Sequence, residues 1–344
     1  MPVRAGWTPA GVSLAVAILA VLVALPRFLS PYTTDFMRDV LIFGVFALSL
    51  DLLWGRAGIL SFGQSAFFGL GAYAMGLAGT RIVSPNPTYI GVILGMVVPA
   101  LLAVVLGYFL FYGGVRGTYF TILTIAVTLV LQRIALSWVE LTGGNNGIFG
   151  ILPFTLSLPG WSHTIASEAG LYYMALAAAV ICYLFVRILA ASSFGRVLTA
   201  IRDNERRTEF LGFDTSLYSL VTLVISAAIA GLAGALYASM VTFVSPELFG
   251  LAFATEVIVW VAVGGRGTLV GAFVGVLAVH TLRDQISSYN ATAWPAVLGL
   301  FFLLVVFVFP RGIVDYLTTA ARAVTARFSR ERVAATPSRS PGNQ

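Results

Sequence analysis

The chain has 344 residues, of which 59% are apolar and only 10% are charged. Soluble domains carry about 25% charged residues, so this composition excludes a protein that water surrounds on all sides. The formal net charge is +6, and every cationic side chain is an arginine because the sequence contains no lysine. The absence of lysine excludes a Walker A ATPase, a protein kinase and Schiff-base chemistry, which all need that side chain.

Ten apolar segments follow one another along the chain, and most reach the roughly 20 residues that a helix needs to cross the hydrocarbon. A period-2 alternation typical of membrane strands is absent, so helices are the expected spanning elements. The predicted spans are 10–26, 36–54, 61–80, 89–111, 117–136, 170–189, 216–240, 252–264, 268–283 and 295–310. The eighth and ninth are short, and we expect a hairpin, crossing or re-entrant, around the turn Gly264–Gly267.

The arginines set the expected orientation of these spans. No arginine occurs from 134 to 186, which places the long loop 137–169 outside, whereas 187–207 contains five and belongs inside. With ten spans both termini are cytoplasmic, and 15 arginines lie inside against five outside. The basic excess therefore indicates membrane orientation and not nucleic-acid binding. Residues 1–315 form the expected all-α transmembrane domain, and 316–344 form a cytoplasmic, Arg-rich and partly disordered tail.

The inner loop 190–215 is the longest polar stretch between spans. Ser193 can cap a helix over 194–212 and Gly212 can end it, while Asp203 and Arg207 have the spacing of a stabilising helical pair. Its apolar side chains would provide a packing face: Phe194, Leu198, Ile201 and Leu211. The pattern is consistent with a cytoplasmic helix that docks on a partner. A solvated connector between two spans explains it about equally well.

Two polar features lie inside the spans. The fifth span carries Thr121, Thr124, Thr128 and Gln132 on one helix face, which indicates a polar lining for a translocation pathway. Threonine often bonds back to its own helix, so packing within the helix is the alternative. Gln64 needs a partner at membrane depth and is a further pathway candidate. The many small residues around it, from 61 to 79, favour close helix packing.

The lone Cys182 cannot form a disulfide within the chain. His163 and His280 are too few and too isolated to indicate a metal site. We therefore expect neither a metal nor a bound cofactor. The acidic residues fall near the ends of the predicted spans, which disfavours an ion-coupled secondary transporter, the second alternative function.

Four ordered motifs resemble the permease subunits of the branched-chain amino acid and urea ABC importers. They lie at 53–73, at 115–120 with 142–147, at 190–212, and at 260–272 with 309–312. Arg56 departs from the aromatic residue, and Gln64 from the histidine, that the family often has at these positions. The resemblance covers most of the chain and is closer to the urea branch. It implies transport of urea or a related short amide, with branched-chain amino acids as the alternative.

The same resemblance implies an assembly in the cytoplasmic (inner) membrane of a bacterium. The expected partners are a second homologous permease, two ATPase subunits and a periplasmic or extracellular substrate-binding protein. ATP would be hydrolysed by the ATPase subunits, so this chain is not expected to be an enzyme. The residues that the resemblance assigns to coupling with the ATPase are Arg196, Ile201, Arg202, Asp203, Glu209, Leu211 and Gly212.

The predicted orientation can be tested by labelling single cysteines in a Cys182→Ala background. A cysteine at position 204 should react only with reagents that reach the cytoplasm, because the inner loop carries the arginine excess. A cysteine at position 145 should react from outside and serves as the matched control. Labelling of position 204 from outside would show that the orientation is inverted.

Overall fold

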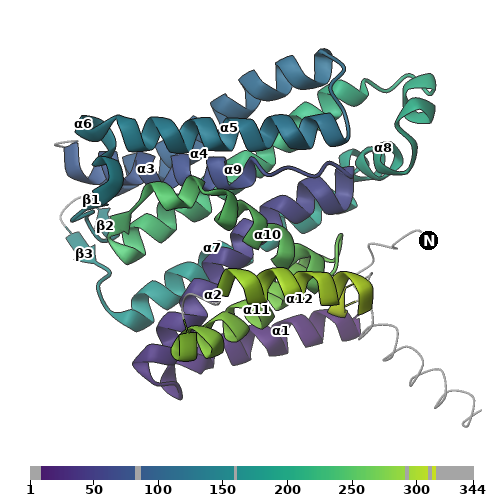
Figure 1. The fold of residues 1–344 in the computed structure, drawn as a ribbon. Coiled ribbons are helices and arrows are strands. Elements are labelled where there is room, and N and C mark those ends of the chain that lie inside the picture. The colour runs from purple at the N-terminus through teal and green to yellow at the C-terminus, as the bar shows by residue number, and fades with distance from the viewer. Residues whose placement is uncertain (1–8, 82–86, 159–160, 291–293, 309–311, 315–344) are drawn as a thin grey trace, which may run out of the picture.

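A computed structural model describes residues 9–81, 87–158, 161–290, 294–308 and 312–314, which are largely helical (Figure 1). The predicted tail 316–344 lies outside the described residues. The α-helices are α1 (Pro9–Ala24), α2 (Pro31–Leu50), α3 (Gln64–Arg81), α4 (Pro87–Gly107), α5 (Thr118–Ser137), α6 (Val139–Thr142), α7 (Glu168–Ala191), α8 (Ser193–Phe210), α9 (Thr215–Val241), α10 (Leu251–Gly264), α11 (Leu269–Asn290) and α12 (Trp294–Val308). The shorter elements are η1 (Leu25–Arg27), η2 (Asp51–Arg56), η3 (Tyr108–Tyr112), η4 (Gly144–Asn146), η5 (Pro246–Phe249), β1 (Ile148–Phe149), β2 (Thr155–Leu158), β3 (Trp161–Thr164) and β4 (Phe243–Val244).

Each of the ten predicted spans coincides with a helix. By length and composition, five of the described helical segments can cross a membrane: Pro87–Tyr112, Thr118–Ser137, Glu168–Ala191, Thr215–Val241 and Leu269–Ser288. Helix α10 is short, with 14 residues, as expected. The prediction of a short ninth segment is wrong, because α11 continues past Arg283 to Asn290 and has 22 residues.

The helices form two packed groups. Helices α3, α4 and α9 pack against one another, while α2 packs against α7, α10 and α11 and also contacts α9 (Figure 1). Helix α8 lies at one end of the bundle, and the short strands lie at the other (Figure 1). This arrangement places the predicted inner loop and the predicted outer loop at opposite ends.

The predicted outer loop is not irregular throughout. Helix α6 and the turn of η4 are followed by β1, which pairs antiparallel with β4, and by a β2–β3 hairpin. The glycines at 143, 144 and 147 all have positive φ angles, which glycine adopts at little cost. The glycine-rich run therefore provides the reversals that bring β1 back to the end of α9.

Helix α2 is the central element of the described fold. Every residue from Val40 to Leu53 is buried, so this stretch is enclosed by protein on all sides. Phe43 and Phe46 contact Phe68 of α3, Phe253 and Trp260 of α10 through their rings, and the Phe46 and Phe68 centroids are 4.6 Å apart. The aromatic cluster joins α2 to both groups of helices.

A seam of glycines lets α3, α4 and α9 approach one another closely. A Cβ atom at Gly71 would collide with the backbone of Gly231, and one at Gly231 would collide with the carbonyl oxygen of Gly95. A Cβ atom at Gly234 would likewise collide with the carbonyl oxygen of Phe68. Small residues favour this close packing in membranes, so the predicted packing role of the 61–79 glycines is confirmed at Gly71.

Substituting a seam glycine should destabilise the bundle. Because the added methyl group at Gly231 meets backbone atoms, we expect Gly231→Ala to lower the free energy of unfolding by about 1–3 kcal/mol, the usual cost of overpacking. The matched control is Gly299→Ala, where a Cβ atom would meet nothing within 4 Å. Thermal unfolding in detergent measures both variants, and equal stability of the two would contradict a packing role for the seam.

Candidate translocation and coupling site

The threonine face of α5 is turned toward the inner strip, which we define as residues 57–63 between η2 and α3. Thr121 Oγ1 donates to the Leu60 carbonyl at 3.1 Å, and Thr124 Oγ1 accepts from the Phe62 amide at 3.2 Å. Thr128 Oγ1 donates to the Phe62 carbonyl at 3.3 Å. All three hydroxyls also lie within hydrogen-bonding distance of carbonyls of their own helix turn. The threonines thus provide polar partners for an irregular stretch of backbone.

The two predicted glutamines have different neighbours from these three threonines. Gln64 is fully buried and forms a polar cluster, in which its amide nitrogen donates to Ser226 Oγ at 2.9 Å and its amide oxygen accepts from Ser49 Oγ at 3.2 Å. Gln132 is half-buried beside Gly250, at the end of η5. In this conformation, Thr121 is the one predicted pathway residue that lines the cavity described next.

A cavity of about 590 Å³ opens between the inner strip, the start of α5 and α8. Its polar lining includes Thr121 and side chains of both charge signs: Arg116, Arg202, Asp203 and Glu205. Arg116 bridges to Glu205 at 3.2 Å and to Glu209 at 2.9 Å. Sequence reasoning did not select Arg116 or Glu205 as site residues. The sequence feature that could have identified Arg116 is its position inside the 115–120 motif.

Helix α8 differs from its sequence-based description in three ways. Its N-terminal cap is Ser192, whose hydroxyl accepts from the Gly195 amide, instead of Ser193. Asn204 has non-helical backbone angles (φ −163°, ψ 98°), so α8 is two helical pieces. The predicted pair between Asp203 and Arg207 is wrong, because this break intervenes and Asp203 pairs with Arg202 at 3.4 Å.

Asn204 caps the second helical piece. Its side-chain oxygen accepts from the Arg207 amide at 3.0 Å. Gly212 has a positive φ of 88° just after the helix ends, so the predicted terminator is confirmed. Thr215 Oγ1 donates to Glu209 at 2.7 Å, and this bond, with Arg116, lowers the pKa of Glu209. Burial raises the pKa of the neighbouring Glu205 carboxyl.

The predicted coupling residues divide into an anchored set and an exposed set. Ile201 is buried and packs within this chain, as does its neighbour Leu198. Leu211 is 70% exposed and the adjacent Phe210 is 91% exposed. Arg196 is also exposed and donates to Ser193 Oγ at 3.0 Å. The first piece of α8 is therefore held by the bundle, while the second piece presents apolar side chains outward.

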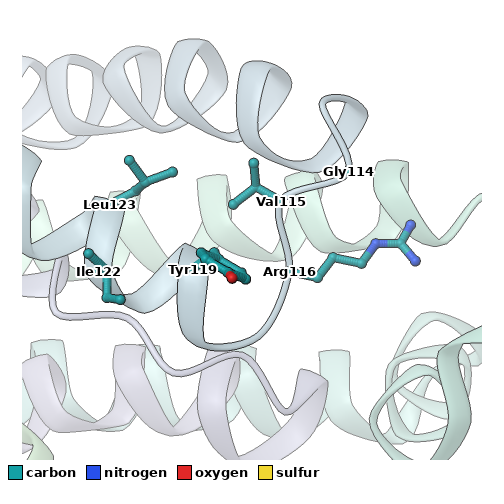
Figure 2. A pocket seen from close by; sticks show the side chains of 6 residues that line it. All are labelled: Gly114, Val115, Arg116, Tyr119, Ile122 and Leu123. Carbon is teal, nitrogen blue, oxygen red and sulfur yellow. The ribbon is translucent and has the colours of Figure 1, made fainter.

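A second, shallower groove of about 440 Å³ follows the start of α5 (Figure 2). Val115, Tyr119, Ile122 and Leu123 form its apolar surface, whereas the side chain of Arg116 extends away from them. No group of three or more His, Cys, Asp or Glu side chains that could hold a metal ion was found among the described residues. The candidate site is a set of helix contacts and polar groups around these two hollows.

Comparison with known proteins agrees with this architecture. Residues 32–309 match the family described as the permease component of the branched-chain amino acid transport system. The high-affinity branched-chain amino acid transport system permease protein LivM of Escherichia coli is 29% identical over 85% of this chain and 72% of its own length. The probable LivM of Methanocaldococcus jannaschii is 27% identical over 78% of this chain and 89% of its own.

A further relative, the permease protein LivH of Salmonella typhimurium, is 24% identical over 79% of this chain and 90% of its own length. No solved structure gives a significant match. The family match covers far more than half of the chain, including the predicted pathway helix α5, the inner strip and α8. The chain therefore belongs to the family of branched-chain amino acid transport system permease components.

Proposed function

We propose that this chain is a membrane-spanning permease subunit of an ATP-driven importer for branched-chain amino acids. The observation that carries the proposal is the family match over 32–309, which includes the polar α5 face and the projecting α8. In this proposal the ten helices cross or enter the membrane with both termini in the cytoplasm. The partners are a second permease, two ATPase subunits that hydrolyse ATP, and a substrate-binding protein outside.

The substrate preference is reversed relative to the sequence-based expectation of urea. The relatives reported above carry branched-chain amino acid names. The charged side chains of the inner cavity do not decide the order, because Arg116 is already paired with Glu205 and Glu209. The proposed pathway residues are those of the predicted lining, namely Thr121, Thr124, Thr128, Gln132 and Gln64.

The proposed ATPase contact is the second piece of α8 with the residues that follow it. Phe210 and Leu211 are large apolar side chains exposed on a polar arm, as expected for a helix that inserts into a groove of a partner. Arg196, Asp203, Glu209 and Gly212 complete the proposed docking and coupling set with the buried Ile201 and the adjacent Arg202. Ile201, which is buried, and Arg202, which donates to the Gly55 carbonyl of this chain, would hold this segment in place. The other members would meet the partner.

Docking can be tested with Leu211→Asp. Because burying a leucine contributes about 1.5–3 kcal/mol, we expect co-purification of the ATPase subunits to fall by about tenfold or more while the permease still inserts. Leu152→Asp, at an exposed leucine near the strand end of the bundle, is the control and should retain the ATPase. Ile201→Asp reports on the fold of α8 instead, since Ile201 is buried. Normal co-purification with Leu211→Asp would exclude this docking surface.

The substrate can be tested on the complex reconstituted with its ATPase and binding-protein partners. We expect the binding protein loaded with leucine to stimulate ATP hydrolysis and leucine uptake, and the same protein loaded with urea to give the basal rate. The unloaded binding protein provides the baseline. Stimulation by urea without stimulation by leucine would restore the urea assignment, and stimulation by neither would refute both substrates.

A further inference from the structure

The segment η2 joins two parts of the protein that are distant in sequence. Its backbone follows a π-helical course over Asp51–Arg56 directly after α2, and such turns are frequent at functional positions. On one side lies α8, with Arg202. On the other side lies the α10–α11 turn, which we define as residues 264–268. On the α8 side an arginine side chain bonds to the η2 backbone. On the other side an η2 carboxylate bonds to the backbone of the turn.

The contact with α8 is made by Arg202. Its guanidinium donates to the Gly55 carbonyl at 2.8 Å, although 147 residues separate the two in sequence. Gly58 allows this approach, because its φ is +78° and a Cβ atom there would lie 2.7 Å from Arg202 Cγ. The anchored piece of α8 is therefore bonded to η2 just before the break at Asn204.

The contact with the α10–α11 turn is made by Asp51. This carboxylate is fully buried and accepts from the Gly267 amide at 2.6 Å. A Cβ atom at Gly55 would lie 2.5 Å from the same Gly267 nitrogen, so the missing side chain lets the two backbones meet. The Arg266 guanidinium lies 5.1 Å from the centroid of the Trp54 ring, which adds a cation–π contact between the same two segments.

The buried charge at this junction is incompletely satisfied. Asp51 Oδ2 and Arg56 Nε are buried, and neither has a hydrogen-bond partner among the described residues. Burying a charged group without full pairing is costly, so each such group in a native structure calls for an explanation.

We propose that Asp51 and Arg202 are positioning residues of one relay, which transmits movement of α8 through η2 to the α10–α11 turn. Arg202 acts on the Gly55 carbonyl, and Asp51 acts on the Gly267 amide, so neither residue touches the substrate. When the ATPase moves α8, the pull on Gly55 shifts η2 and, through Asp51, the start of α11. This inference rests on the proposed function, because it assumes that α8 is moved by an ATPase.

The test uses the complete reconstituted complex and compares Arg202→Ala, Asp51→Ala, their double variant and the conservative Asp51→Asn. Each single alanine variant removes one charge-assisted hydrogen bond, so we expect about a tenfold loss of leucine uptake per ATP hydrolysed. Co-purified ATPase should stay at the wild-type amount. Asp51→Asn keeps an acceptor for the Gly267 amide and should retain more uptake than Asp51→Ala.

The double variant separates a relay from two independent contacts. In a relay the double variant should lose no more uptake per ATP than the more severely impaired single variant, because either break interrupts the same chain. Independent contacts would give an additive loss of about a hundredfold. The charge-matched control is Arg27→Ala, which removes an exposed arginine of η1, outside α8 and outside the proposed ATPase contact. It should retain uptake per ATP.

Three outcomes would overturn the relay: additive losses, a loss of ATPase co-purification with Arg202→Ala, or normal uptake per ATP in that variant. Arg202 is exposed, so its alanine variant should insert normally and carries the test even if Asp51→Ala does not accumulate. A wild-type complex without leucine-stimulated hydrolysis would refute the proposed function. A working wild-type complex with an unaffected Arg202→Ala variant would refute the relay alone.

Discussion

The close approach of α3, α4 and α9 is the constraint on which the rest of the structure depends. Lipid tails are as apolar as leucine side chains, so burial of apolar area does not drive helices together inside a bilayer. Dispersion contacts must do so, and these need backbones within reach of each other. Gly71, Gly95 and Gly231 provide that reach. Their seam holds α9 in place, and α9 in turn contacts the buried α2.

Polar side chains inside the protein form hydrogen bonds with backbone that is not regularly helical. The inner strip has carbonyls and amides that no regular helix satisfies, and the α5 threonines bond to three of them. Backbone that departs from helical geometry is tolerated at membrane depth only where protein or water satisfies it. The hydroxyls proposed to line the pathway are therefore also the groups that hold the inner strip. A change in the position of α5 would alter both.

Periodicity and charge were sufficient to predict the helices, because a bilayer permits few alternatives. The ten predicted segments and the polar face of α5 followed from these rules. The cap at Ser192, the break at Asn204 and the continuation of α11 did not, since each depends on packing between distant segments. Gln64 shows the same limit: its need for a partner was evident, but Ser49 and Ser226 come from two other helices.

The role of Asp51 was also beyond sequence reasoning. An acidic residue at the end of an apolar span is ordinarily explained by proximity to the membrane surface. Only the fold shows that its partner is the Gly267 amide, 216 residues away in sequence. Its neighbour Gly55 carries no chemistry of its own, yet its missing side chain permits the contact. A contact among Asp51, Gly55 and Gly267 follows no regular spacing along the chain, so a single sequence cannot reveal it.

The break at Asn204 has a consequence for how this protein can change over evolutionary time. The piece before the break contains Leu198 and Ile201, which are fixed by the bundle, whereas Phe210 and Leu211 beyond it pack against little of this chain. Substitutions at Phe210 and Leu211 therefore carry a small folding penalty. A new partner surface can be acquired there stepwise while the proximal piece remains unaltered. Selection on stability thus restricts the proximal piece and also Glu205, Thr208 and Glu209, whereas the exposed end at Phe210 and Leu211 is free to diverge.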